Sequence, residues 1–253
     1  MSGDPRVALA QEVRFHRLML RSGTFVDVGA PIGAFIFEIA NVEGVTAVAV
    51  EPLPHAFQVL QQRAAQNSKP ITLINAALSN TPRESVLTVP VLRGGAPIWD
   101  WASIEKDFPL LQQSFPEIVA TQSFPVRVIT LDSLNLPHIS GMKIDAEGSE
   151  YEVLQGGRKV LATMRPVVSV ELEERHRAGC TYAVPAFMDA LGYACFFEIN
   201  GEFLPFARFD RARMQRASPS PIRHEYSDPY ISCFYFVPEE QSELLNRMSL
   251  PKA

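Results

Sequence analysis

Cysteine is scarce in this chain, and long apolar runs are missing from it. The three cysteines, Cys180, Cys195 and Cys233, lie too far apart in sequence for a Cys-x-x-Cys metal or redox motif. Their odd number, with no charged and then apolar leader over Met1–Gln11, indicates a reducing compartment, so we expect a cytoplasmic protein. No stretch approaches the roughly 18 apolar residues of a membrane span.

The chain also lacks a strong charge of one sign. Its net charge of −5 gives no reason to expect binding to nucleic acid or to an anionic membrane surface. Apolar residues make up 47% of the sequence and charged residues 20%, which leaves enough apolar material for a sizeable core. The length of 253 residues fits one large α/β domain as well as two small ones. We expect one domain over residues 1–253, beginning with a helical segment at 1–22.

A middle glycine is missing from the most informative stretch, Thr24–Phe35. A short apolar run ends in Asp27, and Gly29 and Gly33 follow with Gly-x-x-x-Gly spacing in place of the Gly-x-Gly-x-x-Gly of dinucleotide binders. This strand–turn–helix pattern lets a ligand approach the turn, because glycine has no Cβ, and Pro31 suits the first helical turn. An acid without phosphate-binding glycines suits a cationic ligand such as S-adenosylmethionine, and a tight turn with no ligand is the alternative.

Two later strand ends add to this pattern. Glu51-Pro52 follows the predicted second strand about 20 residues after the glycine turn, where nucleotide-binding α/β folds hold a ribose diol. Asn75-Ala76-Ala77 follows the third strand, and its small residues suit a flat wall for an adenine ring, with Asn75 as a hydrogen-bonding group. A solvated acid at the strand end is the simpler interpretation of Glu51, but the spacing from the glycine turn favours a ligand.

Acidic residues gather at a further pair of strand ends. Asp145, Glu147 and Glu150 lie within six positions after an apolar strand, and Glu171 ends the next strand. Open α/β sheets bind ligands at the carboxyl ends of their strands, so these acids are candidate site residues.

Strands alternate with helices up to about Ala190, and hairpin-like strands follow. The predicted strands are Phe25–Val28, Val45–Val50, Ile71–Ile74, Val86–Val91, Gly141–Asp145, Val167–Val170, Tyr193–Ile199, Glu202–Phe206 and Ile231–Val237. The predicted helices include Val7–Arg21, Ile32–Ala40, Pro54–Gln66, Ile104–Gln113 and Pro185–Leu191. The pattern favours an α/β fold with a mainly parallel sheet, helices on both faces and antiparallel strands at one edge.

Taken together, these motifs resemble the FkbM family of S-adenosylmethionine-dependent methyltransferases. The residues that carry the resemblance are Asp27-Val28-Gly29-Ala30 with Gly33, Glu51-Pro52, Asn75-Ala76-Ala77-Leu78-Ser79, Leu131-Asp132, Met142–Glu150 with Val153-Leu154 and Gly156-Gly157, and Phe234-Tyr235-Phe236. The resemblance runs from about residue 24 to residue 237, and Met142–Glu150 is its most specific part. Pro31 departs from the family, which usually has an asparagine there.

The resemblance implies a Rossmann-like class I methyltransferase fold with a seven-stranded sheet. It also implies methyl transfer to a hydroxyl oxygen of a small-molecule or glycan acceptor, either a sugar or a polyketide-type natural product. The residues that it places against S-adenosylmethionine are Asp27, Gly29, Ala30, Gly33, Glu51, Pro52, Asn75, Ala76, Ala77 and Asp145.

A hydroxyl is a poor nucleophile until it loses its proton, so a general base or a metal ion is expected beside it. Asp145 is the first candidate for the base, Glu147 and Glu171 are the next, and His176 is more remote. Strand-end acids bind magnesium in some sugar O-methyltransferases. No sequence pattern here fixes a metal, so we predict no metal ligand and leave magnesium dependence open.

Two other functions remain as alternatives. A nicotinamide-dependent oxidoreductase is disfavoured by the missing middle glycine and by the lack of a Tyr-x-x-x-Lys pair. A non-catalytic protein that keeps a cofactor pocket gains some support from Pro31.

The acceptor is the part that the sequence leaves open. Residues 93–125 are rich in aromatic residues, including Trp99 and Trp101, and form either a lid and acceptor wall or a core or subunit contact. Residues 207–230 form a basic loop whose cationic members are Arg208, Arg211, Arg213, Arg216, Arg223 and His224. An arginine fork matches phosphate or carboxylate, which favours an anionic acceptor. A solvated loop, or contact with an acidic face of a second subunit in a homodimer, is the alternative.

Overall fold

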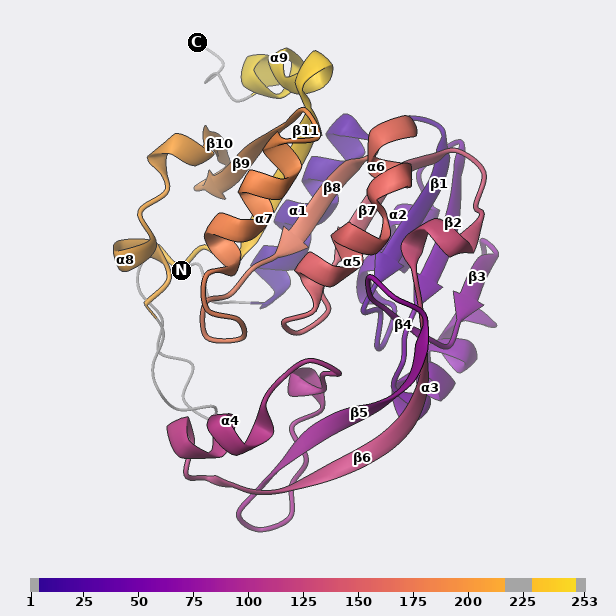
Figure 1. Ribbon diagram of the computed structural model, residues 1–253. Coiled ribbons are helices and arrows are strands. Elements are labelled where there is room, and N and C mark those ends of the chain that lie inside the picture. The colour runs from indigo at the N-terminus through magenta and orange to yellow at the C-terminus, as the bar shows by residue number, and fades with distance from the viewer. Residues whose placement is uncertain (1–4, 217–228, 249–253) are drawn as a thin grey trace.

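The computed structural model describes residues 5–216 and 229–248. Eight strands form its central sheet: β1 (Gly23–Val28), β2 (Val45–Val50), β3 (Ile71–Ile74), β7 (Ile139–Ile144), β8 (Val167–Glu171), β9 (Tyr193–Ile199), β10 (Glu202–Pro205) and β11 (Cys233–Pro238). Their order is β10-β9-β11-β8-β7-β1-β2-β3 (Figure 1). The five strands from β8 to β3 are parallel, and β11 runs antiparallel between β8 and β9.

The mainly parallel sheet with an antiparallel edge is as predicted, but in the described part of the chain the sheet has eight strands and not seven. The eighth strand is β10, which pairs with β9 through the predicted hairpin. Asn200 and Gly201 both have positive φ angles, 52° and 87°, and form the tight turn between these two strands. Such a turn matches the natural twist of a two-stranded hairpin, which explains why the chain adds a strand here.

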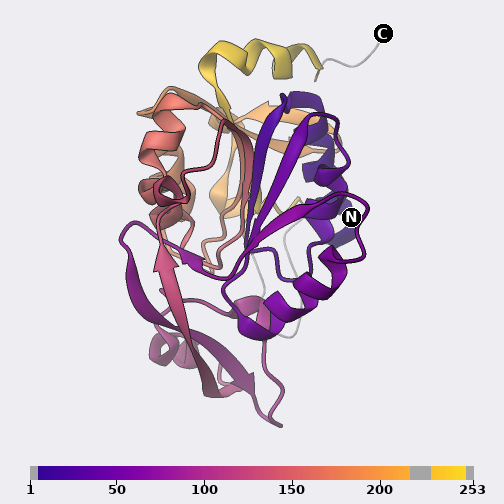
Figure 2. The same ribbon diagram turned by 90° about the vertical axis from the view of Figure 1, so that its right-hand side faces the viewer.

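Helices cover both faces of the sheet, as the apolar strands require. One face carries α1 (Pro5–Met19), α2 (Ala34–Ala40) and α3 (Pro54–Ala64), and the other carries α5 (Glu150–Gly156), α6 (Arg158–Thr163) and α7 (Cys180–Asp189). Figure 2 shows the two helix layers on either side of the sheet. The last helix, α9 (Glu239–Met248), packs Leu245 against the face that α1 covers. Both faces of the central strands are therefore buried, and the ligand-binding surface is confined to the strand ends.

Several predicted helix boundaries are wrong, and three of the differences have a local cause or consequence. The helix after the glycine turn begins at Ala34, with Gly33 as its N-cap at φ 71°, so Pro31 lies before the helix and outside its first turn. Helix α7 begins at Cys180 and contains Pro185 in its interior. The helix predicted over residues 104–113 is α4 (Phe108–Ser114), because Ser103 is held in an extended bridge to Thr88.

A second, smaller sheet projects below the strand ends. It consists of β4 (Ala77–Leu78), β5 (Arg83–Leu92) and β6 (Ile118–Ile129) in the order β4-β6-β5. We call β5, β6 and the chain between them the arm; the aromatic-rich residues 93–125 lie within it (Figure 1). Residues 97–106 of the arm, including the short helix η1 (Trp99–Trp101), form what we call the wall segment.

The predicted basic loop is described only in part. Residues 206–208 form the short helix η3 (Phe206–Arg208), and α8 (Arg211–Met214) follows, whereas Arg223 and His224 lie outside the described residues. Arg211 contacts Glu174 at 3.4 Å and packs over the Tyr182 ring. Within residues 5–216 and 229–248, none of the helices combines the length and the hydropathy that a membrane crossing needs.

Candidate active site

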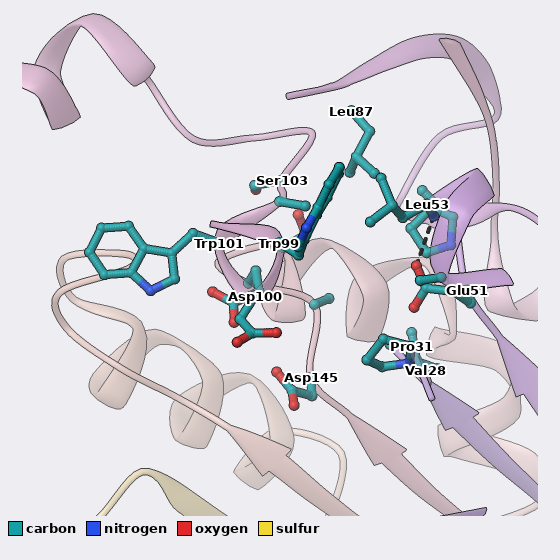
Figure 3. A pocket seen from close by; sticks show the side chains of 18 of the residues that line it. Val28, Pro31, Glu51, Leu53, Leu87, Trp99, Asp100, Trp101, Ser103 and Asp145 are labelled. Carbon is teal, nitrogen blue, oxygen red and sulfur yellow. Dashed lines mark hydrogen bonds between the residues drawn. The ribbon is translucent and has the colours of Figure 1, made fainter. Parts of the chain in front are cut away.

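A cavity of about 720 Å³ opens at the carboxyl ends of the parallel strands. Its lining comes from the ends of β1, β2, β7 and β8, from the start of α3, and from the wall segment opposite them. Figure 3 shows Asp100 on the wall segment above Asp145, with Glu51 on the far side of the cavity. The volume lies within the range of small-molecule and cofactor sites, and the sheet and the arm both contribute to it.

Gly29 and Gly33 are required by the chain's own packing. A Cβ on Gly29 would lie 1.8 Å from the Asp145 carbonyl oxygen, and its φ of 79° disfavours any other residue. A Cβ on Gly33 would lie 2.6 Å from the Phe37 ring. The sequence analysis explained both glycines by the approach of a ligand, and the structure supplies a different reason. Gly29 still lines the cavity, and so does Pro31.

Asp27 lies beneath the cavity and is not among the residues that line it. Its side chain is buried, and one carboxylate oxygen accepts a hydrogen bond from the Ile36 N–H, whereas Oδ1 has no hydrogen-bond partner among the described residues. Burial raises the pKa of Asp27 to about 7, although the nearby Lys143 ammonium opposes that rise. In this structure Asp27 holds the start of α2, so a contact with the cofactor remains a prediction.

Glu51 is better placed for a ligand. Its Oε1 accepts a hydrogen bond from the Leu53 N–H at 2.7 Å, which fixes the carboxylate at the cavity edge (Figure 3). Burial raises the pKa of Glu51 to about 7, and the Leu53 hydrogen bond acts in the opposite direction. Pro52 also lines the cavity. One carboxylate oxygen is thus used to hold the loop, and the second is left for a hydroxyl group of a ligand.

The wall predicted after the third strand is only partly present. Ala76 and Ala77 line the cavity, but Asn75 does not. The Asn75 side-chain amide donates instead to the main-chain oxygens of Glu51, at 2.8 Å, and Pro52, at 3.2 Å. Asn75 therefore fixes the loop that carries Glu51. Ala30 is buried in the core between β1 and α2, away from the lining.

Asp145 and Lys143 form a charge pair at the cavity floor. Lys143 Nζ donates to Asp145 Oδ2 at 3.0 Å, and both residues stand on the same face of the chain because they are two positions apart at the end of β7. Burial alone would raise the pKa of Asp145, but the Lys143 ammonium and a hydrogen bond with Glu171 outweigh it and hold that pKa below its usual range. Asp145 is thus kept ionised at the cavity surface.

Glu171 ends β8 beside Asp145 and also lines the cavity. The negative charge of Asp145 raises the pKa of Glu171 well above its usual range, and burial adds to the shift. Two neighbouring carboxyl groups of this kind share one proton, with Glu171 as its carrier and Asp145 as the charged partner.

Glu147 is engaged by two other side chains. Its Oε2 accepts from Lys106 Nζ at 2.8 Å and lies 3.0 Å from His176 Nδ1. Burial raises the pKa of Glu147 to about 8, against the opposing Lys106 charge, and it lowers the pKa of His176 well below its usual value. His176 is therefore neutral. It is not among the residues that line the cavity, so its role as a base remains only a prediction.

The sequence analysis missed several residues of the site. His55, in the first turn of α3, packs against Trp99 with ring centroids 5.8 Å apart and an interplanar angle of 40°, and both line the cavity. Arg175 lines the cavity beside Trp101 and pairs with Glu173. Lys143 could have been found, since side chains two positions apart on a strand share a face. Within residues 5–216 and 229–248, no group of three or more His, Cys, Asp or Glu side chains could hold a metal ion.

The sequence matches the family described as "Methyltransferase FkbM domain" over residues 27–195. The chain belongs to the FkbM methyltransferase family. Membership of this family implies S-adenosylmethionine as the methyl donor. The cavity suits such a molecule, because the Glu51 carboxylate, desolvated at its edge, has one oxygen available for hydroxyl groups. The family match includes all the predicted site residues but not α1, β10 or β11.

Solved structures of methyltransferases share the fold of this FkbM family member. The structure of methyltransferase FkbM from Methylobacillus flagellatus KT is 17% identical with a TM-score of 0.54, and the match covers 89% of this chain and 47% of that chain. This chain thus spans about half the length of that protein. A search among curated proteins found no match.

Two more distant structures are an O-methyltransferase from Bacillus cereus in complex with SAH and a precorrin-6y C5,15-methyltransferase from Geobacter metallireducens GS-15. The first is 10% identical with a TM-score of 0.44, and the match covers 92% of this chain and 80% of that one. The second is 12% identical with a TM-score of 0.48, and the match covers 90% and 87%. Both are too distant to support an argument about this chain.

Proposed function

We propose that this protein transfers a methyl group from S-adenosylmethionine to a hydroxyl oxygen of a sugar or polyketide-type acceptor. The observation that carries the proposal is Asp145, which lines the cavity and is kept ionised by Lys143. A carboxylate there can accept the proton of an acceptor hydroxyl as that oxygen becomes a nucleophile.

S-adenosylmethionine supplies a methyl group that already carries a good leaving group, so the protein mainly orients the acceptor and removes one proton. Glu51 binds the ribose hydroxyls through its free carboxylate oxygen, while Asn75 and the Leu53 N–H hold the loop in place. Asp145 accepts the hydroxyl proton, and Glu171 hydrogen-bonds to Asp145. Glu147 is a weaker candidate for the base, because Lys106 and His176 already contact its Oε2.

The role of Glu51 can be tested with two substitutions. Glu51→Ala should weaken S-adenosylmethionine binding by about 1–3 kcal/mol, since a charged hydrogen-bond partner is lost. Glu51→Gln keeps an oxygen that can accept from the Leu53 N–H but replaces the free oxygen with a donor, so a similar loss of affinity is expected. Calorimetric titration measures both. Unchanged affinity in Glu51→Gln would mean that Glu51 serves the loop and not the ligand.

The charges around the cavity favour an uncharged acceptor. On the acceptor side of the lining, Glu147 is paired with Lys106 and the Arg175 guanidinium with Glu173, while Asp100 adds a further carboxylate. None of the described arginines of the basic loop lines the cavity. We therefore propose a neutral hydroxylated acceptor in place of the anionic one that the basic loop suggested.

Matched acceptors would decide this point. A neutral glycoside should be turned over with a lower KM than its carboxylated counterpart, and the difference should shrink as added salt screens the charges. A lower KM for the carboxylated glycoside would instead favour the basic loop as the part of the protein that contacts the acceptor. S-adenosylmethionine binding without turnover of any acceptor would favour a non-catalytic binding protein.

A further inference from the structure

The wall segment reaches the cavity from the arm and not from the central sheet. Backbone bridges hold it to β5, at Thr88–Ser103 and Val91–Pro97. Trp99 packs against Phe124 of β6 with ring centroids 6.2 Å apart, so the side chain is braced from the arm as well. Trp99 also packs against His55 of α3, which fixes this end of the wall segment to the Glu51 side of the cavity. The other end, which faces Asp145, needs a separate attachment.

Lys106 supplies such an attachment. Its side chain is only 4% exposed, and Nζ lies 2.8 Å from Glu147 Oε2, on the loop that follows β7. The same ammonium lies 3.5 Å from the Trp101 main-chain oxygen and 5.6 Å from the centroid of the Trp101 ring. A buried ammonium is costly unless it is paired, so this contact fixes where the end of the wall segment can lie.

Glu147, the partner of Lys106 in this contact, is also fixed in position. Glu147 has a φ of 51°, unusual for a residue with a side chain, and its Oε2 is also within 3.0 Å of His176 Nδ1 on the segment after β8. His176 in turn packs edge-on against Trp101, with ring centroids 5.9 Å apart. One carboxylate thus joins the arm to two loops of the central sheet, beside Asp145.

We propose that Lys106 is a positioning residue, which latches the wall segment onto Glu147 and so completes the acceptor half of the cavity. The expected effect on acceptor binding rests on the proposed function. The contact between Lys106 and Glu147, which we call the latch, does not depend on it. In this proposal Glu147 holds the wall segment and does not act as the general base.

The latch can be tested without any acceptor. The chain has two tryptophans, Trp99 and Trp101, and both lie in the wall segment, so tryptophan emission reports on that segment alone. Trp101 is 5% exposed. In a Trp99→Phe background, Lys106→Met should make Trp101 markedly more accessible to acrylamide quenching. Amide exchange at Trp101 and Ser103 should accelerate by about ten- to a hundredfold, the factor expected for one hydrogen bond donated by a charged group.

Arg83→Met is the matched control. Arg83 pairs with Glu105 next to Lys106, but its side chain is 35% exposed and it does not line the cavity. This substitution should leave Trp101 quenching and exchange near the wild-type values. Glu147→Met, which leaves no oxygen to accept from Lys106 Nζ, should loosen the wall segment as Lys106→Met does. The double variant should add little, because both changes remove the same contact.

Calorimetry separates the latch from the proposed function. Lys106→Met should bind S-adenosylmethionine with the wild-type affinity, and its KM for a hydroxylated acceptor should rise more than its kcat falls. Equal quenching and exchange in Lys106→Met and wild type would overturn the latch, and so would equal loosening by Arg83→Met. Failure of the wild-type protein to bind S-adenosylmethionine would instead overturn the proposed function and leave the exchange result standing.

Discussion

Asp145→Asn should lower turnover by about 10²–10⁴-fold, because a carboxamide cannot accept the proton of the acceptor hydroxyl. The amide oxygen can still accept the hydrogen bond from Lys143 Nζ, which lies 3.0 Å away in the wild type. The variant should therefore fold, although it loses the charge that balances a buried ammonium. We expect a loss of unfolding free energy of about 1–3 kcal/mol.

Turnover per folded molecule and the thermal midpoint should be measured on the same samples. Asp132→Asn is a suitable control, since the Asp132 carboxylate accepts from the Val160 N–H at 2.9 Å and lies away from the cavity lining. That substitution removes one of the two oxygens that accept from the Lys159 and Val160 N–H groups at the start of α6. It should cost about 1 kcal/mol of unfolding free energy and leave turnover unchanged. Normal turnover by folded Asp145→Asn would transfer the role of base to Glu171.

Gly29→Ala should reduce the free energy of unfolding by about 2–5 kcal/mol. One part of this cost is the left-handed backbone conformation, and the other is the overlap of the new Cβ with the Asp145 carbonyl oxygen, 1.8 Å away. The Gly29 Cα and the Asp145 carbonyl oxygen both belong to the backbone, so they cannot move apart without a shift of β1 or β7. Urea unfolding monitored by circular dichroism measures the change.

Gly201→Ala separates the two parts of that cost. Gly201 also has a positive φ, 87°, but a Cβ there would meet nothing within 4 Å. Only the conformational cost of about 1–2 kcal/mol is then expected. Equal losses for the two variants would show that the close approach of Asp145 to Gly29 contributes nothing to stability.

Local patterns in the sequence were sufficient to predict most of the central sheet. Strands β2 and β3 have their predicted bounds, since short apolar runs between turn residues define a buried parallel strand. The Asn200-Gly201 pair predicted the hairpin for the same local reason. The position of β11 between β8 and β9 could not be predicted, because it depends on a pairing between segments that are distant in the chain.

The candidate site also contains residues that could be predicted from local sequence patterns and residues that could not. Glu51, Asp145 and Glu171 could be chosen from the sequence because each ends a predicted strand, and all three line one cavity. Lys106 could not be chosen, since its partner Glu147 is 41 positions away and no local pattern joins them. The reason for a glycine at position 29 could not be predicted either. The atom that excludes a Cβ there is the carbonyl oxygen of Asp145, which follows β7 and lies far from Gly29 in the sequence.

The arm enters and leaves the fold at a single point. Its chain departs after β4 and returns along β6, and these two strands lie side by side, with Ala77 opposite Val128 and Leu78 opposite Ile129. An insertion whose ends are adjacent can change in length or sequence at little cost to the host sheet. Under the function proposed here, exchange of the arm would change the acceptor preference and leave unchanged the part of the protein that carries Glu51 and Asp145.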